Sequence, residues 1–192
     1  MDYFEKQEAT CIYNLQQLMA HSKPHSFIDR LISDYVPNRQ YSYTDVTTIN
    51  YTGGTAPLEL KTRDERNIPY IEQDGIFVEP DKVQHGAKIY MNFLGDWKYV
   101  TIHFLPCIPI QNLEIVNVSC YNSGNVEPKY KLPLSWGYIL KYDGTQYHMT
   151  KPTEVFPCDR LTPVEYDPEA WAEARMERLE ILRQYNKDII VN

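Results

Sequence analysis

Two strand-like runs on either side of a pair of glycines constrain the fold of this chain most strongly. Residues 39–51, RQYSYTDVTTINY, are rich in Tyr, Thr, Val and Ile, and residues 56–63, APLELKTR, form a second run of similar length. Gly53 and Gly54 lie between the runs and adopt positive φ angles at no steric cost. The pattern therefore predicts an antiparallel hairpin with arms of ordinary strand length.

The second arm carries a carboxylate and an ammonium group on one face. Glu59 and Lys61 flank Leu60, so both point to the same side of the strand. Asp45 lies in the first arm and comes near this face if the arms pair around the glycines, although the sequence does not fix the register. One interpretation is an exposed Glu–Lys pair, which contributes little to stability.

The second interpretation is a metal site. Two carboxylates on neighbouring strands suit Mg²⁺, or Mn²⁺ in its place, because such a cation takes oxygen ligands and completes its shell with water. Asp45 and Glu59 would be these ligands, and the backbone carbonyl of Leu60 would be a further one. A lysine beside the cation, here Lys61, can position or deprotonate a water molecule.

The rest of the chain predicts a mixed α/β domain. Residues 2–20 have apolar side chains at helical spacing, and residues 27–35 form a second helix that Ser26 caps and Pro37 ends. A polar segment, 64–75, is expected to be a loop. Further expected elements are a strand and short helix in 76–88, strands 89–94 and 99–105, strands around a turn at 143–144, and a helix over 162–187 capped by Asp167 with apolar contacts from Trp171, Met176, Leu179 and Leu182.

Composition limits the function classes. The chain of 192 residues is long enough for one domain with a core of its own. A net charge of −7 argues against a general polyanion binder, although opposite charges can gather on separate faces. No histidine pair with zinc-protease spacing occurs, and His103 is expected to be a buried or half-buried strand residue.

Cysteines and the N-terminus indicate a reducing compartment. The four cysteines form no CxxC pair, and the segment MDYFEKQEAT has neither a basic start nor an apolar stretch. No apolar run is long enough to span a membrane. We therefore expect a cytoplasmic protein whose cysteines are reduced thiols, largely buried.

An aspartate, a hairpin and then LELKTR together resemble the PD-(D/E)XK nuclease superfamily, which includes restriction endonucleases, Holliday-junction resolvases and phage exonucleases. A helix that carries a carboxylate, Glu8, precedes the hairpin, and a strand with a short lysine-bearing helix follows it. The likeness covers residues 1–105 and implies a restriction-endonuclease-like core, a central mixed sheet flanked by helices. Residues 106–192 have no counterpart and are expected to form the remainder of the same domain, with strands and a C-terminal helix.

The resemblance implies a Mg²⁺- or Mn²⁺-dependent nuclease that hydrolyses DNA, with RNA as a second option. Asp45 and Glu59 would bind the metal, and Lys61 would orient the attacking water. Glu8 would be an outer carboxylate, although a first-turn glutamate that reaches solvent explains it equally well. Thr44 stands where the motif often has a proline. The resemblance leaves open whether the chain acts alone or as a homodimer.

Three cations near the motif are candidate nucleic-acid contacts. Arg63 and Arg66 can bind phosphates, with a solvated loop as the alternative. Lys82 can face either the metal site or DNA, with a surface ion pair as the alternative. Tyr41 and Tyr43 share a face with Asp45 and suit either core packing or base stacking. The rival to a nuclease is a non-catalytic binding or structural module, of phage or mobile-element origin, that keeps the nuclease fold.

Overall fold

The computed structural model of the chain describes residues 3–38, 44–50, 53–84, 87–119, 124–158 and 166–190. The α-helices are α1 (Tyr3–Ala20), α2 (Phe27–Leu31), α3 (Ile68–Asp74), α4 (Pro80–Gln84) and α5 (Pro168–Ile190). The strands are β1 (Asp34–Pro37), β2 (Val46–Ile49), β3 (Thr55–Arg63), β4 (Ile76–Val78), β5 (Ile89–Leu94), β6 (Tyr99–Phe104), β7 (Glu114–Ser119), β8 (Val126–Leu132), β9 (Tyr138–Tyr142) and β10 (Tyr147–Thr150). Four short 3-10 helices complete the list: η1 (Glu65–Asn67), η2 (Leu105–Cys107), η3 (Ile110–Asn112) and η4 (Leu134–Trp136).

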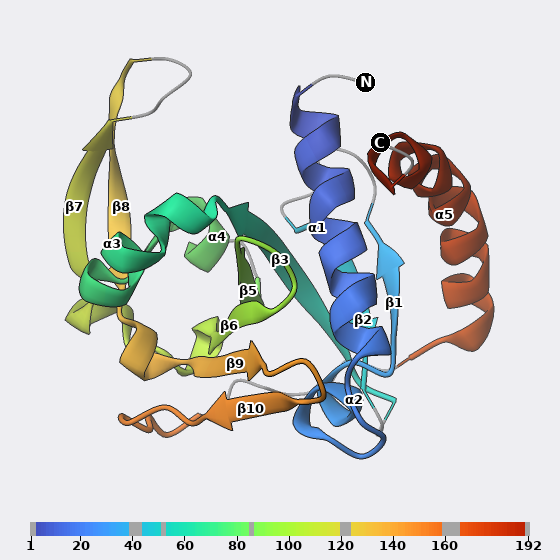
Figure 1. The fold of residues 1–192 in the computed structure, drawn as a ribbon, viewed down its shortest axis with the longest axis horizontal. Coiled ribbons are helices and arrows are strands. Elements are labelled where there is room, and N and C mark those ends of the chain that lie inside the picture. Colours follow the sequence, from blue (N-terminus) through green and yellow to red (C-terminus); the bar gives the residue numbers. More distant parts are fainter. Residues whose placement is uncertain are drawn as a thin grey trace.

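A seven-stranded mixed sheet forms the centre of the molecule (Figure 1), in the order β1-β2-β3-β5-β6-β9-β10. Neighbouring strands are antiparallel except β3 and β5, which run parallel. The predicted hairpin is present as β2 and β3, and the mixed α/β class is confirmed. A smaller sheet, β4-β8-β7, extends into a two-stranded arm of β7 and β8 that projects beside α3.

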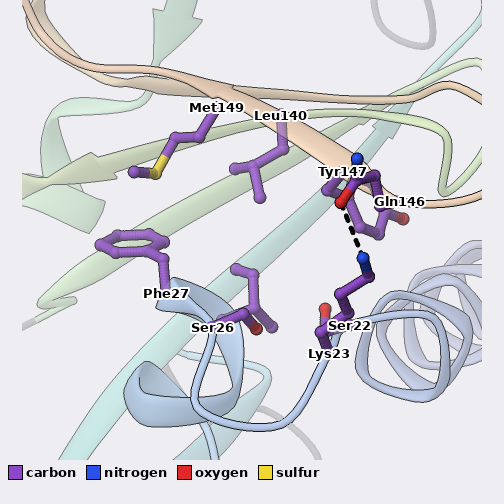
Figure 2. Close-up of a pocket in the computed structure, with 9 residues that line it drawn as sticks. Ser22, Lys23, Ser26, Phe27, Leu140, Gln146, Tyr147 and Met149 are labelled. Atoms are coloured by element: carbon purple, nitrogen blue, oxygen red, sulfur yellow. Dashed lines mark hydrogen bonds between the residues drawn. The ribbon is translucent and has the colours of Figure 1, made fainter.

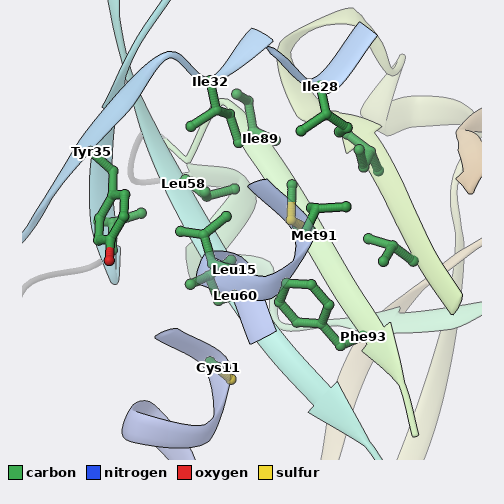
Figure 3. Packing of buried hydrophobic residues seen from close by; sticks show 14 of the residues in the cluster. Cys11, Leu15, Ile28, Ile32, Tyr35, Leu58, Leu60, Ile89, Met91 and Phe93 are labelled. Carbon is green, nitrogen blue, oxygen red and sulfur yellow. The ribbon is translucent and has the colours of Figure 1, made fainter. Parts of the chain in front are cut away.

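Helices α1 and α2 cover one face of the large sheet. Alternate residues of β3 and β5 point to this face, because side chains along a strand alternate between its two sides. Figure 3 shows the packing, in which Cys11 and Leu15 from α1 lie near Leu58, Leu60 and Met91 from the sheet. Burial of these apolar side chains holds α1 against β3.

Strand β4, helix α3 and the segment after β6 cover the other face. Tyr90 and Leu94 of β5 pack there with Ile71, Ile76 and Leu132. Glu59 and Lys61 belong to this face, because each pairs with a β5 residue, Tyr90 and Asn92 respectively, on the same side of the sheet. The Glu59 side chain therefore lies on the same face of the sheet as Tyr90 and the second apolar cluster.

Strands β9 and β10 and helix α5 tie residues 106–192 to the preceding part of the chain. Strand β9 pairs with β6, and α5 packs on α1 and β1, where Arg175 forms an ion pair with Asp34. The predicted cap of α5 is confirmed, since Asp167 Oδ1 accepts hydrogen bonds from the N–H groups of Glu169 and Ala170. Met176 was expected to make apolar contacts, but its side chain is exposed. The side chains of residues 179 and 182 lie outside the described ones.

Two element predictions were wrong. The helix expected over 27–35 ends at Leu31, because residues 34–37 pair with β2 as an edge strand. The segment 64–75 was expected to be a loop but forms η1 and α3. Asp64 accepts a hydrogen bond from the Arg66 N–H at the start of η1, Pro69 stands in the first turn of α3, and Ile71 anchors α3 to the core.

The expectation of reduced thiols was also wrong for one pair. Cys107 and Cys158 form a disulfide that spans 51 residues of sequence. Cys11 is a buried free thiol, as expected, and residue 120 lies outside the described residues. Across the described ranges, none of the helices combines the length and the apolar character that a membrane crossing needs.

Candidate metal and phosphate site

Asp45 lies directly before β2, where the first arm of the hairpin begins to pair. Val46 pairs with Leu58, and the Asp45 N–H also donates to the Leu58 carbonyl over 3.2 Å. The carboxylate bends back to the open edge of β3, where Oδ2 accepts the Leu60 N–H at 2.7 Å. The Asp45 side chain therefore takes the place of a strand partner for Leu60, which lies beyond the first pair of β2 and β3.

Glu59 is the centre of the cluster. Its side chain is 3% exposed, and the Asp45 carboxylate lies close enough to raise its pKa. The ammonium groups of Lys61 and Lys82 lie 3.5 and 3.4 Å from the same oxygen, Oε1. The second oxygen, Oε2, is buried and has no hydrogen-bond partner among the described residues. The structure thus brings together the three residues of the predicted motif and adds Lys82 from α4.

The Asp45 carboxylate disfavours ionisation of Glu59. Burial, followed by the neighbouring charge of Asp45, raises the pKa of Glu59 to about 7, against the opposing effect of both lysines. Burial also raises the pKa of Asp45, although the hydrogen bond from Leu60 and the two ammonium groups act in the opposite direction. A carboxyl pair of this kind is stabilised by a proton or by a cation.

Lys61 stays protonated in this site. Burial lowers its pKa, but the combined effect of Tyr90, Glu59, Glu79 and Asp45 outweighs burial and raises the pKa above its usual range. The Lys61 side chain is 29% exposed, so its ammonium group reaches solvent while it contacts Glu59. It is thus placed to donate hydrogen bonds both to Glu59 and to a molecule that enters from outside.

The donor set suits a hard divalent cation. Asp45 and Glu59 offer carboxylate oxygens, including the buried unpartnered Oε2. The N–H and C=O of a strand residue point to the same edge, so the Leu60 carbonyl faces the side where Asp45 accepts the Leu60 N–H. No cluster of three or more His, Cys, Asp or Glu side chains suited to a metal occurs among the described residues. Two carboxylates with water ligands are the usual set for Mg²⁺.

Glu8 lies on α1, on the opposite face of β3 from Lys61. It is half-buried and precedes Cys11 by one turn, and the Cys11 Sγ lies 3.4 Å from the Thr62 hydroxyl. Cys11 itself is neutral, since burial raises the pKa of its thiol to about 12. The role of Glu8 as an outer carboxylate stays a prediction.

The three predicted phosphate-binding cations have different surroundings. Lys82 contacts Glu59 and so faces the Asp45–Glu59 cluster. Arg66 is exposed in η1, and its guanidinium forms two hydrogen bonds to the Asp64 carboxylate, both 3.0 Å long. Arg63 is half-buried at the end of β3 and lines a separate groove. Residues 41 and 43 lie outside the described residues.

A row of buried polar side chains continues from Glu59 across the same face of the sheet. Asn92 pairs with Thr101, and Tyr90 pairs with His103, on β5 and β6. The amide of Asn92 and the hydroxyl of Thr101 are buried and have no partner among the described residues. His103 was predicted to be buried, and its Nε2 lies 2.9 Å from the Pro133 carbonyl. Sequence reasoning missed Asn92, although its place in an otherwise apolar strand, IYMNFL, was a signal.

A small cavity lies away from the carboxylates, between the turn after α1 and strands β9 and β10 (Figure 2). Its walls include Phe27, Leu140 and Met149, and a hydrogen bond of 2.8 Å from Lys23 to Gln146 runs along one side. The cavity contains no pair of titratable groups that resembles the Asp45–Glu59 cluster.

Comparisons with protein-family models, with curated proteins and with solved structures found no match to this chain.

Proposed function

We propose that the protein is a Mg²⁺- or Mn²⁺-dependent nuclease of the PD-(D/E)XK type, with DNA as its substrate. The observation that carries the proposal is the meeting of Asp45 and Lys61 at the buried carboxyl group of Glu59, although the hairpin turn separates Asp45 from the other two in sequence. A chance Glu–Lys pair on an exposed strand face would leave Asp45 elsewhere and would expose Glu59.

The order of the elements supports the same proposal. Helix α1, the hairpin of β2 and β3, the lysine-bearing helix α4 and strand β5 follow one another as the resemblance implies. Strand β5 lies beside β3 and parallel to it, so α4 stands next to the Glu59 face. We therefore assign a restriction-endonuclease-like core to residues 1–105.

The metal would be held by Asp45, Glu59 and the Leu60 carbonyl. When bound, such an ion stabilises negative charge on a phosphate oxygen and lowers the pKa of a water ligand. The buried Glu59 Oε2 fits this role because a carboxylate oxygen without a donor is costly to bury.

The chain's own residues prepare the site for hydrolysis. Lys61 remains charged and partly exposed, so its ammonium group orients a water molecule towards a phosphate that enters from solvent. Lys82 offsets part of the Glu59 charge from the side of α4. The Leu60 N–H fixes the orientation of the Asp45 carboxylate. These contacts keep the reacting groups in place before the substrate arrives.

Cleavage of a labelled oligonucleotide duplex with Mg²⁺ or Mn²⁺ tests the proposal. We expect Lys61→Ala and Glu59→Gln to lower the single-turnover rate by a factor on the order of 100 to 10,000. Lys82→Met should also slow cleavage, because it removes one of the two ammonium groups beside Glu59. Lys151→Ala and Glu173→Gln, which change exposed residues elsewhere, are the matched controls and should cleave at the wild-type rate.

Cleavage that survives both Lys61→Ala and Glu59→Gln would contradict the proposal, because it would have to come from another site or from a contaminant. Absence of cleavage by the wild-type protein, on duplex, single-stranded and RNA substrates with either metal, would favour the non-catalytic binding module.

A further inference from the structure

A groove between α3 and the β7–β8 arm lies next to the candidate site. It has a cavity volume of about 490 Å³. Arg63 at the end of β3, Tyr70 on α3, Ser119 on β7 and Lys129 on β8 contribute to its walls. Figure 1 shows the arm projecting beside α3, with the carboxyl end of β3 close to both.

The groove offers cations that lack acidic partners. Within the described part of the chain, Arg63 and Lys129 form no ion pair, whereas nearby Arg66 contacts Asp64 at 3.0 Å and Lys131 contacts Glu114 at 3.8 Å. Asp74 also lines the groove, which therefore carries two cations and one carboxylate. In an acidic protein, two such cations in one groove favour an anionic ligand.

The groove continues the path of the candidate site. Glu59, Lys61 and Arg63 alternate along β3 and share one face, so Arg63 stands about 7 Å beyond Lys61. A nucleic-acid strand whose scissile phosphate lies at Lys61 would bring a neighbouring phosphate to Arg63 and the following one towards Lys129. This step rests on the proposed nuclease function.

The size and the aromatic content of the groove favour a single strand. A volume of about 490 Å³ is that of a small-molecule pocket, which accommodates nucleotides of one strand and not a duplex. Tyr70 is 67% exposed at the wall of the groove, where its ring offers a stacking surface for a base.

We propose that this groove binds the single-stranded end of the DNA substrate, next to the phosphodiester bond that is cut. Arg63 and Lys129 contact phosphates, and Tyr70 stacks on a base. The preferred substrate is then a duplex with an overhang or a flap, whose unpaired strand enters between α3 and the arm.

Fluorescence anisotropy without divalent metal tests the groove separately from cleavage. The probes are a labelled oligothymidylate of about ten nucleotides, a length that single-strand sites accommodate, and a blunt duplex of equal length. We expect the wild-type protein to bind the single strand more tightly. Tyr70→Ala and Lys129→Glu should each weaken this binding about 10-fold, and Lys129→Ala should lower the salt slope by about one. Lys151→Glu, an exposed lysine outside the groove, is the control and should bind as the wild type does.

The proposed role of the groove would be contradicted if Tyr70→Ala and Lys129→Glu bound the single strand as tightly as the wild type does. Tighter binding of the blunt duplex than of the single strand would contradict it too. The two proposals fail separately. If Tyr70→Ala and Lys129→Glu cleave a blunt duplex with metal at the wild-type rate, the proposed role of the groove is wrong but the nuclease proposal stands. If the protein binds the single strand through both residues but cleaves no substrate with either metal, the proposed role of the groove is supported and the nuclease proposal is wrong.

Discussion

Glu59 is a carboxylate that the fold buries between a second carboxylate and two ammonium groups. Burial and the Asp45 carboxylate raise its pKa, and Lys61 and Lys82 lower it. A buried cluster of this kind is not an efficient source of stability, because desolvation of the charges offsets much of their attraction. The proposed function gives the cluster a role in metal binding instead of in stability.

His103 gives the fold a dependence on pH that is separate from the cluster. Burial lowers its pKa from 6.5 to about 4, so the folded protein keeps the ring neutral while the unfolded chain protonates it. The stability that this contributes is fully present above pH 6.5 and is lost as the pH falls towards 4. Over this range we expect the wild type to lose about 3 kcal/mol more than His103→Gln.

Urea unfolding at several pH values measures this difference. His103→Gln preserves a donor for the Pro133 carbonyl but cannot take up a proton. Its free energy of unfolding should therefore fall less steeply below pH 6.5. Parallel pH profiles for the two proteins would show that His103 titrates normally in the folded state.

Strands β6 and β9 approach so closely near η4 that the connection requires a glycine. A Cβ atom added at Gly137 would lie 2.7 Å from both the His103 ring and the Ile102 carbonyl oxygen. Neither the Ile102 backbone nor the fully buried His103 ring has room to shift, so the sheet itself would have to move.

Gly137→Ala should destabilise the protein by about 1 to 3 kcal/mol, the usual cost of overpacking. Ser135→Ala changes an exposed residue of the same η4 turn and is the matched control. Thermal unfolding followed by circular dichroism compares the two. An unchanged melting temperature in Gly137→Ala would mean that β6 and β9 lie further apart than the structure has them.

Elements with a clear local pattern could be predicted from the sequence, and others could not. Helix α1 and the hairpin have periodic or turn-defined sequences, and both are present. Helix α3 was missed because it buries only Ile71 and has a proline in its first turn, so its sequence resembles a polar loop. The strand β7 was missed although its half-buried residues, Val116 and Val118, alternate with exposed ones.

The same limits apply to the site. Asp45, Glu59 and Lys61 could be named from residue type and spacing, but their convergence depends on a pairing register that local sequence does not determine. Lys82 comes from α4, and the sequence left open whether it faces this site, DNA or a surface partner; the structure shows its contact with Glu59. The groove beside Arg63 depends on the arm, which sequence analysis did not predict.

The molecule as a whole is held together across its two sequence halves. Strand β9 extends the sheet beyond β6, α5 packs on α1, and the Cys107–Cys158 disulfide links the segment after β6 to the segment after β10. Such a link restricts the unfolded chain more than the folded one. The sequence could not predict this disulfide, because cysteines 51 residues apart can pair only if the fold brings them together.

Reduction should therefore lower the stability of the whole domain. For a 51-residue separation, the chain-entropy argument gives a loss of up to about 4 kcal/mol. We expect dithiothreitol and Cys158→Ser to lower the melting temperature equally, and dithiothreitol to have no further effect on the variant. If dithiothreitol does not change the melting temperature of the wild type, and Cys107 reacts with an alkylating reagent, the disulfide does not form.

Calorimetric titration of Mn²⁺ into the metal-free protein tests the metal cradle of Asp45 and Glu59 most directly. At pH 8 Glu59 is largely ionised, because its pKa is about 7. We predict one site of submillimolar affinity in the wild type and in the control Glu173→Gln, and its loss in Asp45→Asn and in Glu59→Gln. The proposed metal site would be contradicted if the wild type does not bind Mn²⁺ at millimolar concentration, or if Asp45→Asn and Glu59→Gln both still bind it.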